Sequence, residues 1–175
     1  MTIGAQTSRP IGHEQFCHVH PAECRPLDAH QSHRPLKLTP AMIVAISAVN
    51  TGVNVEIKPE SDQKVYGVKE WWAYPDKKVG DCEDFALLKR RMLHEIGIDL
   101  SDLLMTVVRK RDGEGHAVLT LRTTNGDFIL DNLNWKVIPW NEAPYTFLKR
   151  QDPRNPGAWQ QINDGTEVLV GAVAK

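Results

Sequence analysis

Apolar positions recur at helical spacing in two stretches of the first hundred residues. Thr39 and Pro40 form a cap and a first turn ahead of the apolar run AMIVAISAVN, which predicts a helix from residue 40 to near Gly52. A clearer helix is predicted to begin after Asp81 and to stop at Gly97. Its apolar positions, three or four residues apart, are Phe85, Leu88, Met92, Leu93 and Ile96.

Beyond Ser101 the pattern changes to the short β-rich runs of strands, separated by turn residues. Strands are predicted at 103–109, 116–122 and 127–133, with further strands at 136–140 and 159–162. The pair Asn125-Gly126 between two of these runs is a strong hairpin signal. Helices followed by antiparallel strands predict an α+β fold in a single domain.

Two stretches are less regular. Residues 1–38 are rich in proline and histidine and show little periodicity, so we expect a loop-rich N-terminal arm ahead of a domain that covers residues 39–175. Residues 61–72 carry a weaker helical pattern that ends before Pro75.

Composition excludes several classes of protein. The 175 residues hold 21 basic and 22 acidic side chains, so no global field attracts nucleic acid or anionic lipid. The longest uncharged apolar run, residues 41–53, is too short to span a bilayer. The first ten residues contain no apolar segment of the kind that a signal peptide needs. This last observation leaves the compartment open, because a mature secreted domain would look the same.

Two of the three cysteines lie close together in FCHVHPAEC. A short loop closed by Pro21 brings Cys17 and Cys24 within disulfide range, and such a bond persists in oxidising compartments. Two free thiols and a metal site are the alternatives, the latter because His18 and His20 lie in the same stretch. The spacing favours the disulfide, since zinc motifs pair their ligands at tighter, repeated intervals.

The third cysteine, Cys82, falls in the first turn of the helix that follows Asp81. Unpaired N–H groups and the positive end of the helix dipole stabilise a thiolate at this position. His116 opens a predicted strand and Asp131 ends the next one, so the hairpin brings them to neighbouring positions. A cysteine, a histidine and an orienting acid form the general arrangement for thiol nucleophilic catalysis. Taken singly, each of the three also fits a structural role.

The segments GDCEDFALLKRRMLHEIGI, GHAVLTL and FILDN, in this order, resemble the bacterial transglutaminase-like cysteine proteinase family. The resemblance covers about Pro40 to Trp140. Its best-understood member type is a periplasmic protease that releases biofilm adhesins from the cell surface. The resemblance implies a papain-like core in which a Cys-bearing helix packs on an antiparallel sheet.

The resemblance also implies the chemistry. Cys82 would be the nucleophile, His116 the general base and acid, and Asp131 the orienting carboxylate, in peptide-bond hydrolysis through a thioester. Family members act on surface adhesins and depend on calcium. In characterised systems an inner-membrane receptor for cyclic di-GMP sequesters the protease. We therefore expect a periplasmic enzyme with a protein substrate and no nucleic-acid partner.

Calcium has a physical reason in this sequence. Acidic neighbours raise the pKa of the Cys82 thiol, and a bound divalent cation removes that penalty. We expect Asp81 and Glu83 as calcium ligands, with Asp127 or backbone carbonyls as weaker candidates. The alternative is that these acids only cap and solubilise the helix.

Two other functions use the same fold. A transglutaminase-type enzyme keeps the three residues but passes the acyl group to an amine instead of water. A non-catalytic binding module would use the groove to hold a partner segment, and its Cys82 thiol would have ordinary reactivity.

Overall fold

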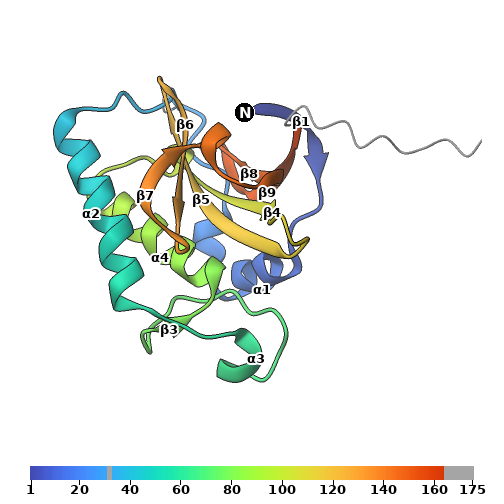
Figure 1. Ribbon diagram of the computed structural model, residues 1–175. Helices are drawn as coiled ribbons and strands as arrows, with labels where there is room; N and C mark the ends of the chain where they lie inside the picture. The colour runs from blue at the N-terminus through green and yellow to red at the C-terminus, as the bar shows by residue number, and fades with distance from the viewer. Residues whose placement is uncertain (31–32, 164–175) are drawn as a thin grey trace, which may run out of the picture.

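The structure is a computed structural model that describes residues 1–30 and 33–163 (Figure 1). Its main sheet is antiparallel throughout, with the strand order β1-β9-β8-β4-β5-β6-β7. These strands are β1 (Thr2–Thr7), β4 (Leu103–Arg109), β5 (Gly115–Thr123), β6 (Gly126–Asp131), β7 (Asn134–Pro139), β8 (Thr146–Asp152) and β9 (Asn155–Asn163). A separate parallel pair joins β2 (Lys58–Pro59) to β3 (Val79–Gly80).

The α-helices of the described residues all lie between β1 and β4 in the chain (Figure 1). The α-helices are α1 (Ile11–Val19), α2 (Pro40–Glu56), α3 (Asp62–Val65) and α4 (Cys82–Glu95). Short 3₁₀-helices are η1 (Pro21–Cys24), η2 (Leu100–Asp102) and η3 (Trp140–Glu142). Helix α4 packs against β4, β5 and β6, while α2 packs against α4 and β7. The predicted α+β fold, with a Cys-bearing helix on an antiparallel sheet, is confirmed.

The core forms because strand side chains alternate between the two faces of the sheet. Leu119 and Leu121 of β5 point into the larger cluster, which also contains Leu87 and Leu93 of α4. Val118, directly before Leu119, points to the opposite face and joins a second cluster. The second cluster also contains Val108, Ile129, Phe147 and Ile162. The sheet is therefore buried on both faces near its centre, which gives the site a rigid support.

Two predicted elements end at or near the residues that the sequence indicated. Helix α4 ends at Glu95, two residues before the predicted stop at Gly97, whose φ of +98° is a left-handed conformation that glycine adopts without strain. The β5–β6 hairpin turns at Thr124 and Asn125, and Gly126 begins β6 with a φ of +103°. This tight turn sets the register that places Leu119 opposite Leu130.

The second and third helices differ from the prediction. Helix α2 continues past Gly52 to Glu56, because Val53 is completely buried against Phe85 and Ile57. That burial exceeds the cost of about 1 kcal/mol for a glycine in a helix. Over residues 61–72 only α3 is helical. The chain reverses at Gly67 (φ +76°), and the Asp62 carboxylate accepts the Trp71 N–H instead.

The N-terminal segment is more regular than the expected loop-rich arm. Residues 2–7 form β1, which pairs with β9 at the edge of the main sheet, and α1 and η1 follow. The strand lacked a sequence signal, because its neighbour β9 is more than 140 residues away and supplies the hydrogen bonds. Among the described residues, no helix is long and apolar enough to cross a membrane.

Candidate active site

Cys82 is the first residue of α4 and faces the start of β5. Its sulfur accepts a hydrogen bond from the Ala117 N–H at 3.4 Å, and its thiol donates to Glu83 Oε2 at 3.1 Å. Ala117 directly follows His116, so the helix N-terminus and the strand that carries the histidine meet at this sulfur. The Asp81 side chain makes no capping hydrogen bond to the helix.

The electrostatic setting of Cys82 opposes ionisation. Burial raises the pKa of its thiol well above the usual range, and the Glu83 carboxylate beside it adds to this effect. Burial, with the charge of Asp81, also raises the pKa of Glu83 to about 9. The effect of the helix dipole expected from the sequence is thus outweighed by burial and by two nearby acidic groups.

His116 and Asp131 are in contact. Both are buried, and the distance from His116 Nε2 to Asp131 Oδ1 is 2.9 Å. Because the carboxylate accepts this bond, the neutral imidazole carries its proton on Nε2 and leaves Nδ1 as the nitrogen with a free lone pair. Although burial raises the pKa of Asp131, the hydrogen bond from His116 and others bring it below its usual value.

Two further donors hold the Asp131 carboxylate. The Leu133 N–H donates to Oδ1 at 3.0 Å, and the Tyr145 hydroxyl donates to Oδ2 at 2.5 Å. The Tyr145 ring also lies against His116, with their centroids 5.4 Å apart. No local pattern singled out Tyr145, since it lies in a turn ahead of β8, a strand that was not predicted.

A cluster of acidic side chains lies at the start of α4. Carboxylate oxygens of Asp62, Asp81 and Asp84 lie within 4.8 Å of one another. Asp81 was predicted as a ligand, while Asp62 and Asp84 were not. The parallel pairing of Pro59 with Gly80 explains the approach of Asp62, because it lets the residues after both strands converge.

The cluster has the properties of a cation site. Each of Asp62, Asp81 and Asp84 has one buried carboxylate oxygen without a hydrogen-bond partner in the described part of the chain. Burial raises the pKa of Asp62 to about 6 and that of Asp84 to about 8, and neighbouring carboxylates add to both shifts. Gly80 permits the close packing, because a Cβ there would lie 2.5 Å from Asp84 Oδ2. Oxygen-only donors of this charge fit calcium.

The other two predicted ligands have different partners. The Glu83 carboxylate accepts the Cys82 thiol hydrogen and lies outside the group of three acids. Asp127 forms an ion pair with Arg150 at 3.0 Å. Because the buried Arg150 already neutralises this carboxylate, Asp127 does not join the acidic cluster.

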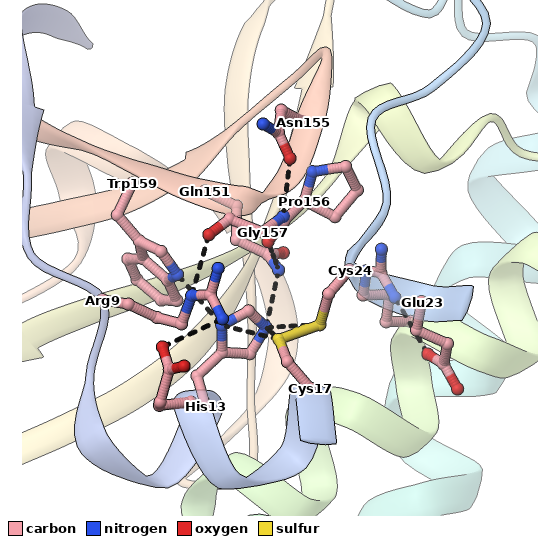
Figure 2. The surroundings of a disulfide bond; sticks show 12 residues. Arg9, His13, Cys17, Glu23, Cys24, Gln151, Asn155, Pro156, Gly157 and Trp159 are labelled. Atoms are coloured by element: carbon pink, nitrogen blue, oxygen red, sulfur yellow. Dashed lines mark hydrogen bonds and ion pairs between the residues drawn. A yellow bond between two sulfur atoms is a disulfide. The ribbon is translucent and has the colours of Figure 1, made fainter. Parts of the chain in front are cut away.

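Cys17 and Cys24 form a disulfide with an S–S distance of 2.01 Å (Figure 2). The bond joins α1 to η1 and lies against the buried His13 ring. Neither His18 nor His20 belongs to the group of possible metal ligands around these sulfurs. Of the three alternatives for this pair, the structure has the disulfide.

A cysteine at a helix N-terminus, packed on an antiparallel sheet with a His–Asp pair, defines a transglutaminase-like thiol enzyme. The sequence profile of the bacterial transglutaminase-like cysteine proteinase family, BTLCP, matches residues 3–167, and the chain belongs to this family. It is therefore a transglutaminase-like cysteine peptidase. A search of curated proteins gives no match.

Solved structures of Legionella pneumophila LapG share the fold. Calcium-bound LapG is 24% identical, with a TM-score of 0.57 over 66% of this chain and 67% of that chain. EGTA-treated LapG is 24% identical, with a TM-score of 0.56 over 63% of each chain. A further LapG structure is 23% identical, with a TM-score of 0.59 over 70% of each chain.

Proposed function

We propose that this peptidase cleaves protein substrates with Cys82 as nucleophile, His116 as general base and acid, and Asp131 as the orienting carboxylate. The observation that carries the proposal is the 2.9 Å contact between His116 and Asp131. The next residue in the strand, Ala117, donates its N–H to Cys82 Sγ, so the three side chains lie in one region. Asp131 holds the proton of His116 on Nε2, which leaves Nδ1 to accept the proton of the thiol.

The reaction proceeds in two stages. The Cys82 sulfur attacks the peptide carbonyl as its proton passes to His116, and His116 then protonates the leaving amine. Water then hydrolyses the thioester: His116 accepts a proton from the water and returns it to the Cys82 sulfur as the acid product leaves. The Cys82 backbone N–H at the start of α4 is proposed as one donor to the oxyanion.

Calcium dependence is part of the proposal, with Asp62, Asp81 and Asp84 as the carboxylates that hold the ion. It is supported by their three unpartnered buried oxygens and by the calcium-bound form of the related LapG. A bound calcium ion would supply positive charge beside Cys82 and lower the pKa of its thiol. Glu83, the other predicted ligand, precedes Asp84 in the chain, and its carboxylate accepts a hydrogen bond from the Cys82 thiol.

Location and partners follow from the family resemblance as proposals. We propose a periplasmic enzyme, a large surface adhesin as substrate and an inner-membrane cyclic di-GMP receptor as regulator. The Cys17–Cys24 bond supports an oxidising compartment, because such bonds are rare in reducing ones.

The first test is the pH dependence of Cys82 alkylation by iodoacetamide, followed by intact mass. With calcium, we expect rapid alkylation with a midpoint well below the free-thiol value of about 8.5, and EGTA or His116→Ala should remove it. Equal, slow alkylation in all three conditions would contradict an activated nucleophile. Cleavage of a purified adhesin fragment, assayed with Cys82→Ala as control, then tests hydrolysis.

The calcium site is tested by calorimetry on the whole chain. Asp62→Asn and Asp84→Asn should each weaken calcium binding by about tenfold or more, because each removes a charged oxygen ligand. Asp76→Asn, an exposed acid in the neighbouring loop, is the matched control and should bind as the wild type does. Unchanged calcium affinity in both variants would mean that calcium does not bind to this cluster.

A further inference from the structure

A polar cavity of about 360 Å³ lies at the end of β5 that is remote from His116. Arg122, one of its lining residues, stands six residues after His116 in the strand, a separation of about 20 Å at the usual rise per residue. The cavity is therefore separate from the proposed active site. Its lining also includes Arg150 of β8, Gln160 of β9 and Ile3 of β1.

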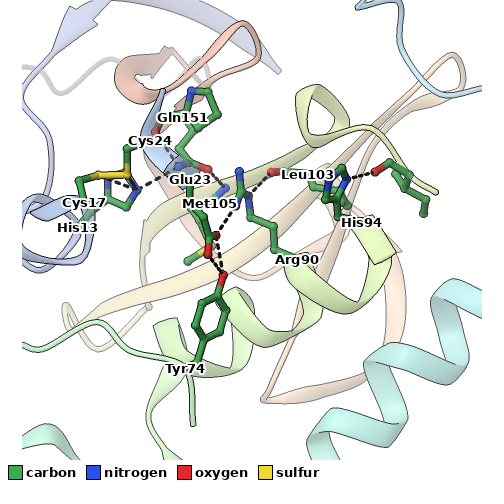
Figure 3. A network of polar contacts seen from close by, with 12 residues as sticks. His13, Cys17, Glu23, Cys24, Tyr74, Arg90, His94, Leu103, Met105 and Gln151 are labelled. Atoms are coloured by element: carbon green, nitrogen blue, oxygen red, sulfur yellow. Dashed lines mark hydrogen bonds and ion pairs between the residues drawn. A yellow bond between two sulfur atoms is a disulfide. The ribbon is translucent and has the colours of Figure 1, made fainter. Parts of the chain in front are cut away.

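The two arginines project from the face of the sheet that α4 does not cover. Arg122 follows Leu121, whose side chain belongs to the core cluster shared with α4. Arg150 precedes Gln151, whose side chain lies against His13 at the edge of that cluster (Figure 3). Because neighbouring residues of a strand point to opposite faces, Arg122 and Arg150 both lie on the far face.

Arg150 is the buried cation of this cavity, with only 5% of its surface exposed. Its Nη1 atom donates to Asp127 at 3.0 Å, whereas its buried Nε–H has no hydrogen-bond partner in the described part of the chain. Burial lowers the pKa of Arg150, and the charge of Arg122 adds to this shift although Asp127 opposes it. An unpaired N–H on a buried guanidinium is costly, so the wall of the cavity lacks an acceptor.

The carboxylates near the cavity already have other partners. Asp102 accepts a hydrogen bond from Arg122 Nε at 3.1 Å. Asp152, the one acid among the described lining residues, accepts the Arg154 N–H on one oxygen at 2.7 Å and the Gln160 amide on the other at 2.6 Å. The guanidinium of Arg154 is exposed and takes part in none of the ion pairs of residues 1–30 and 33–163. Three guanidinium groups thus line the cavity with a single carboxylate, which favours an anionic ligand.

We propose that this cavity binds a small organic molecule that carries a phosphate or carboxylate group. The anionic group accepts hydrogen bonds from the Arg150 Nε–H and from the Arg154 guanidinium, because arginine offers charged N–H donors in a planar fork that matches these oxyanions. Arg122 adds positive charge from β5. Ile3 and Pro153 of the lining provide apolar contacts for the rest of the molecule.

Calorimetry on the whole chain in low-salt, calcium-free buffer tests the site, with inorganic phosphate and succinate as probes. We expect saturable binding of at least one probe. Arg154→Gln should weaken this binding by about fivefold or more, because it removes a charged donor without leaving a buried acid unpaired. Arg111→Gln, at another exposed arginine in the β4–β5 turn, is the matched control for net charge and should bind as the wild type does.

The two probes distinguish the sources of the anionic group. Binding of phosphate alone assigns the site to phosphate compounds, and binding of succinate alone assigns it to carboxylates. No saturable binding of either probe would overturn the proposal. Equal weakening in Arg154→Gln and Arg111→Gln would overturn it too, because the effect would then come from net charge.

NMR of the arginine Nε–H groups tests the part of Arg150 in the wild-type protein. Its Nε–H resonance is assigned through its own backbone, so no substitution of this buried residue is needed. We expect the resonance to shift during titration with the bound probe and to saturate with the calorimetric affinity. A resonance that stays unchanged at saturation would overturn the proposal. Neither measurement uses Cys82 or calcium, so the result does not depend on the proposed function.

Discussion

Three hydrogen bonds converge on the Asp131 carboxylate and divide its two oxygens between different partners. Oδ1 accepts from His116 and from the Leu133 N–H, and Oδ2 accepts from Tyr145. A carboxylate held at both oxygens cannot rotate about its Cβ–Cγ bond, so the direction of the His116 ring is fixed. Tyr145 is in this sense a positioning residue for the proposed triad.

Tyr145→Phe tests that role. We expect the calcium-dependent alkylation of Cys82 to slow by about five- to tenfold, the rate equivalent of one hydrogen bond worth about 1 kcal/mol. Loss of the donor also raises the pKa of Asp131, so the acid limb of the pH–rate profile should move to higher pH. Tyr66→Phe, a more exposed tyrosine, is the control. A rate change without any movement of the pH profile would indicate a merely structural effect.

Lys89 of α4 offers a second prediction for a single residue. Its side chain is fully buried, and Nζ has no hydrogen-bond partner within the described residues. Burial lowers its pKa to about 7, although Asp131 opposes the shift. The cost of burying the charge is therefore complete below pH 7 and disappears as the pH rises toward the unfolded value of about 10.4.

Lys89→Met should accordingly stabilise the protein by roughly 1–3 kcal/mol at pH 6 and by less at pH 9. Urea unfolding at the two pH values measures the difference, with the exposed Lys77→Met as control. A gain of the same size at both pH values would show that Lys89 stays charged in the folded protein up to pH 9, so that burial does not lower its pKa.

At the level of single residues, Cys82, His116 and Asp131 were predicted because each lies at the predicted end of a helix or strand. The Asn125-Gly126 turn was sufficient to bring the histidine strand and the aspartate strand together. Asp62 and Tyr145 have no such signal. Asp62 comes close to Asp81 and Asp84 because β2 pairs with β3, and Tyr145 comes close to Asp131 from the turn before β8, a largely polar strand. Neither of these contacts produces a periodic pattern in the sequence.

Among the elements, α2 holds the turn that follows Asp131. The Asn50 amide donates to the carbonyls of Asn134 and Trp135, and the Asn54 amide donates to the carbonyls of Asp131 and Asn134. Both side chains project from one face of the helix, since they are four residues apart. The β6–β7 turn is thereby fixed to a helix that also packs on α4.

Asn54→Ala should destabilise the protein by about 1–2 kcal/mol and slow Cys82 alkylation, because it removes the bond to the Asp131 carbonyl. Thermal unfolding and the alkylation assay measure the two effects. Thr51→Ala, an exposed position on the same helix, should change neither. Full alkylation rate in Asn54→Ala would show that the turn keeps its position without this contact.

The elements that the sequence predicted well are those with strong local patterns. Helix α4 was predicted within a residue or two because its apolar positions repeat the helical period over its full length, and β4 was predicted at its observed limits because it is a short, nearly continuous apolar run. The C-terminal extension of α2 depends on the burial of Val53, and β1 depends on a partner strand near the other end of the described chain. Such long-range contacts are not encoded in a local window.

For the whole molecule, His13 joins the N-terminal helix to the last two strands of the sheet. It contacts the disulfide on α1 and η1, Gln151 on β8 and Trp159 on β9. Burial lowers the pKa of His13 to about 3, and the charges of Arg9 and Arg90 add to the shift. The folded protein therefore keeps His13 neutral at pH values where the unfolded chain protonates it.

The sign of the resulting pH dependence is fixed. A histidine with a depressed folded pKa contributes stability above its unfolded value of about 6.5, and that contribution is lost as the pH falls toward 3. We expect a loss of about 1.4 kcal/mol in the free energy of unfolding per pH unit below pH 6 from this group.

Asp62 and Asp84, whose pKa values are raised, act in the opposite direction, so the total slope alone does not report on His13. The difference in unfolding free energy between the wild type and His13→Met isolates it, because both proteins share those acids. That difference should shrink from pH 7 to pH 4, and a constant difference would mean that His13 is protonated in the folded state.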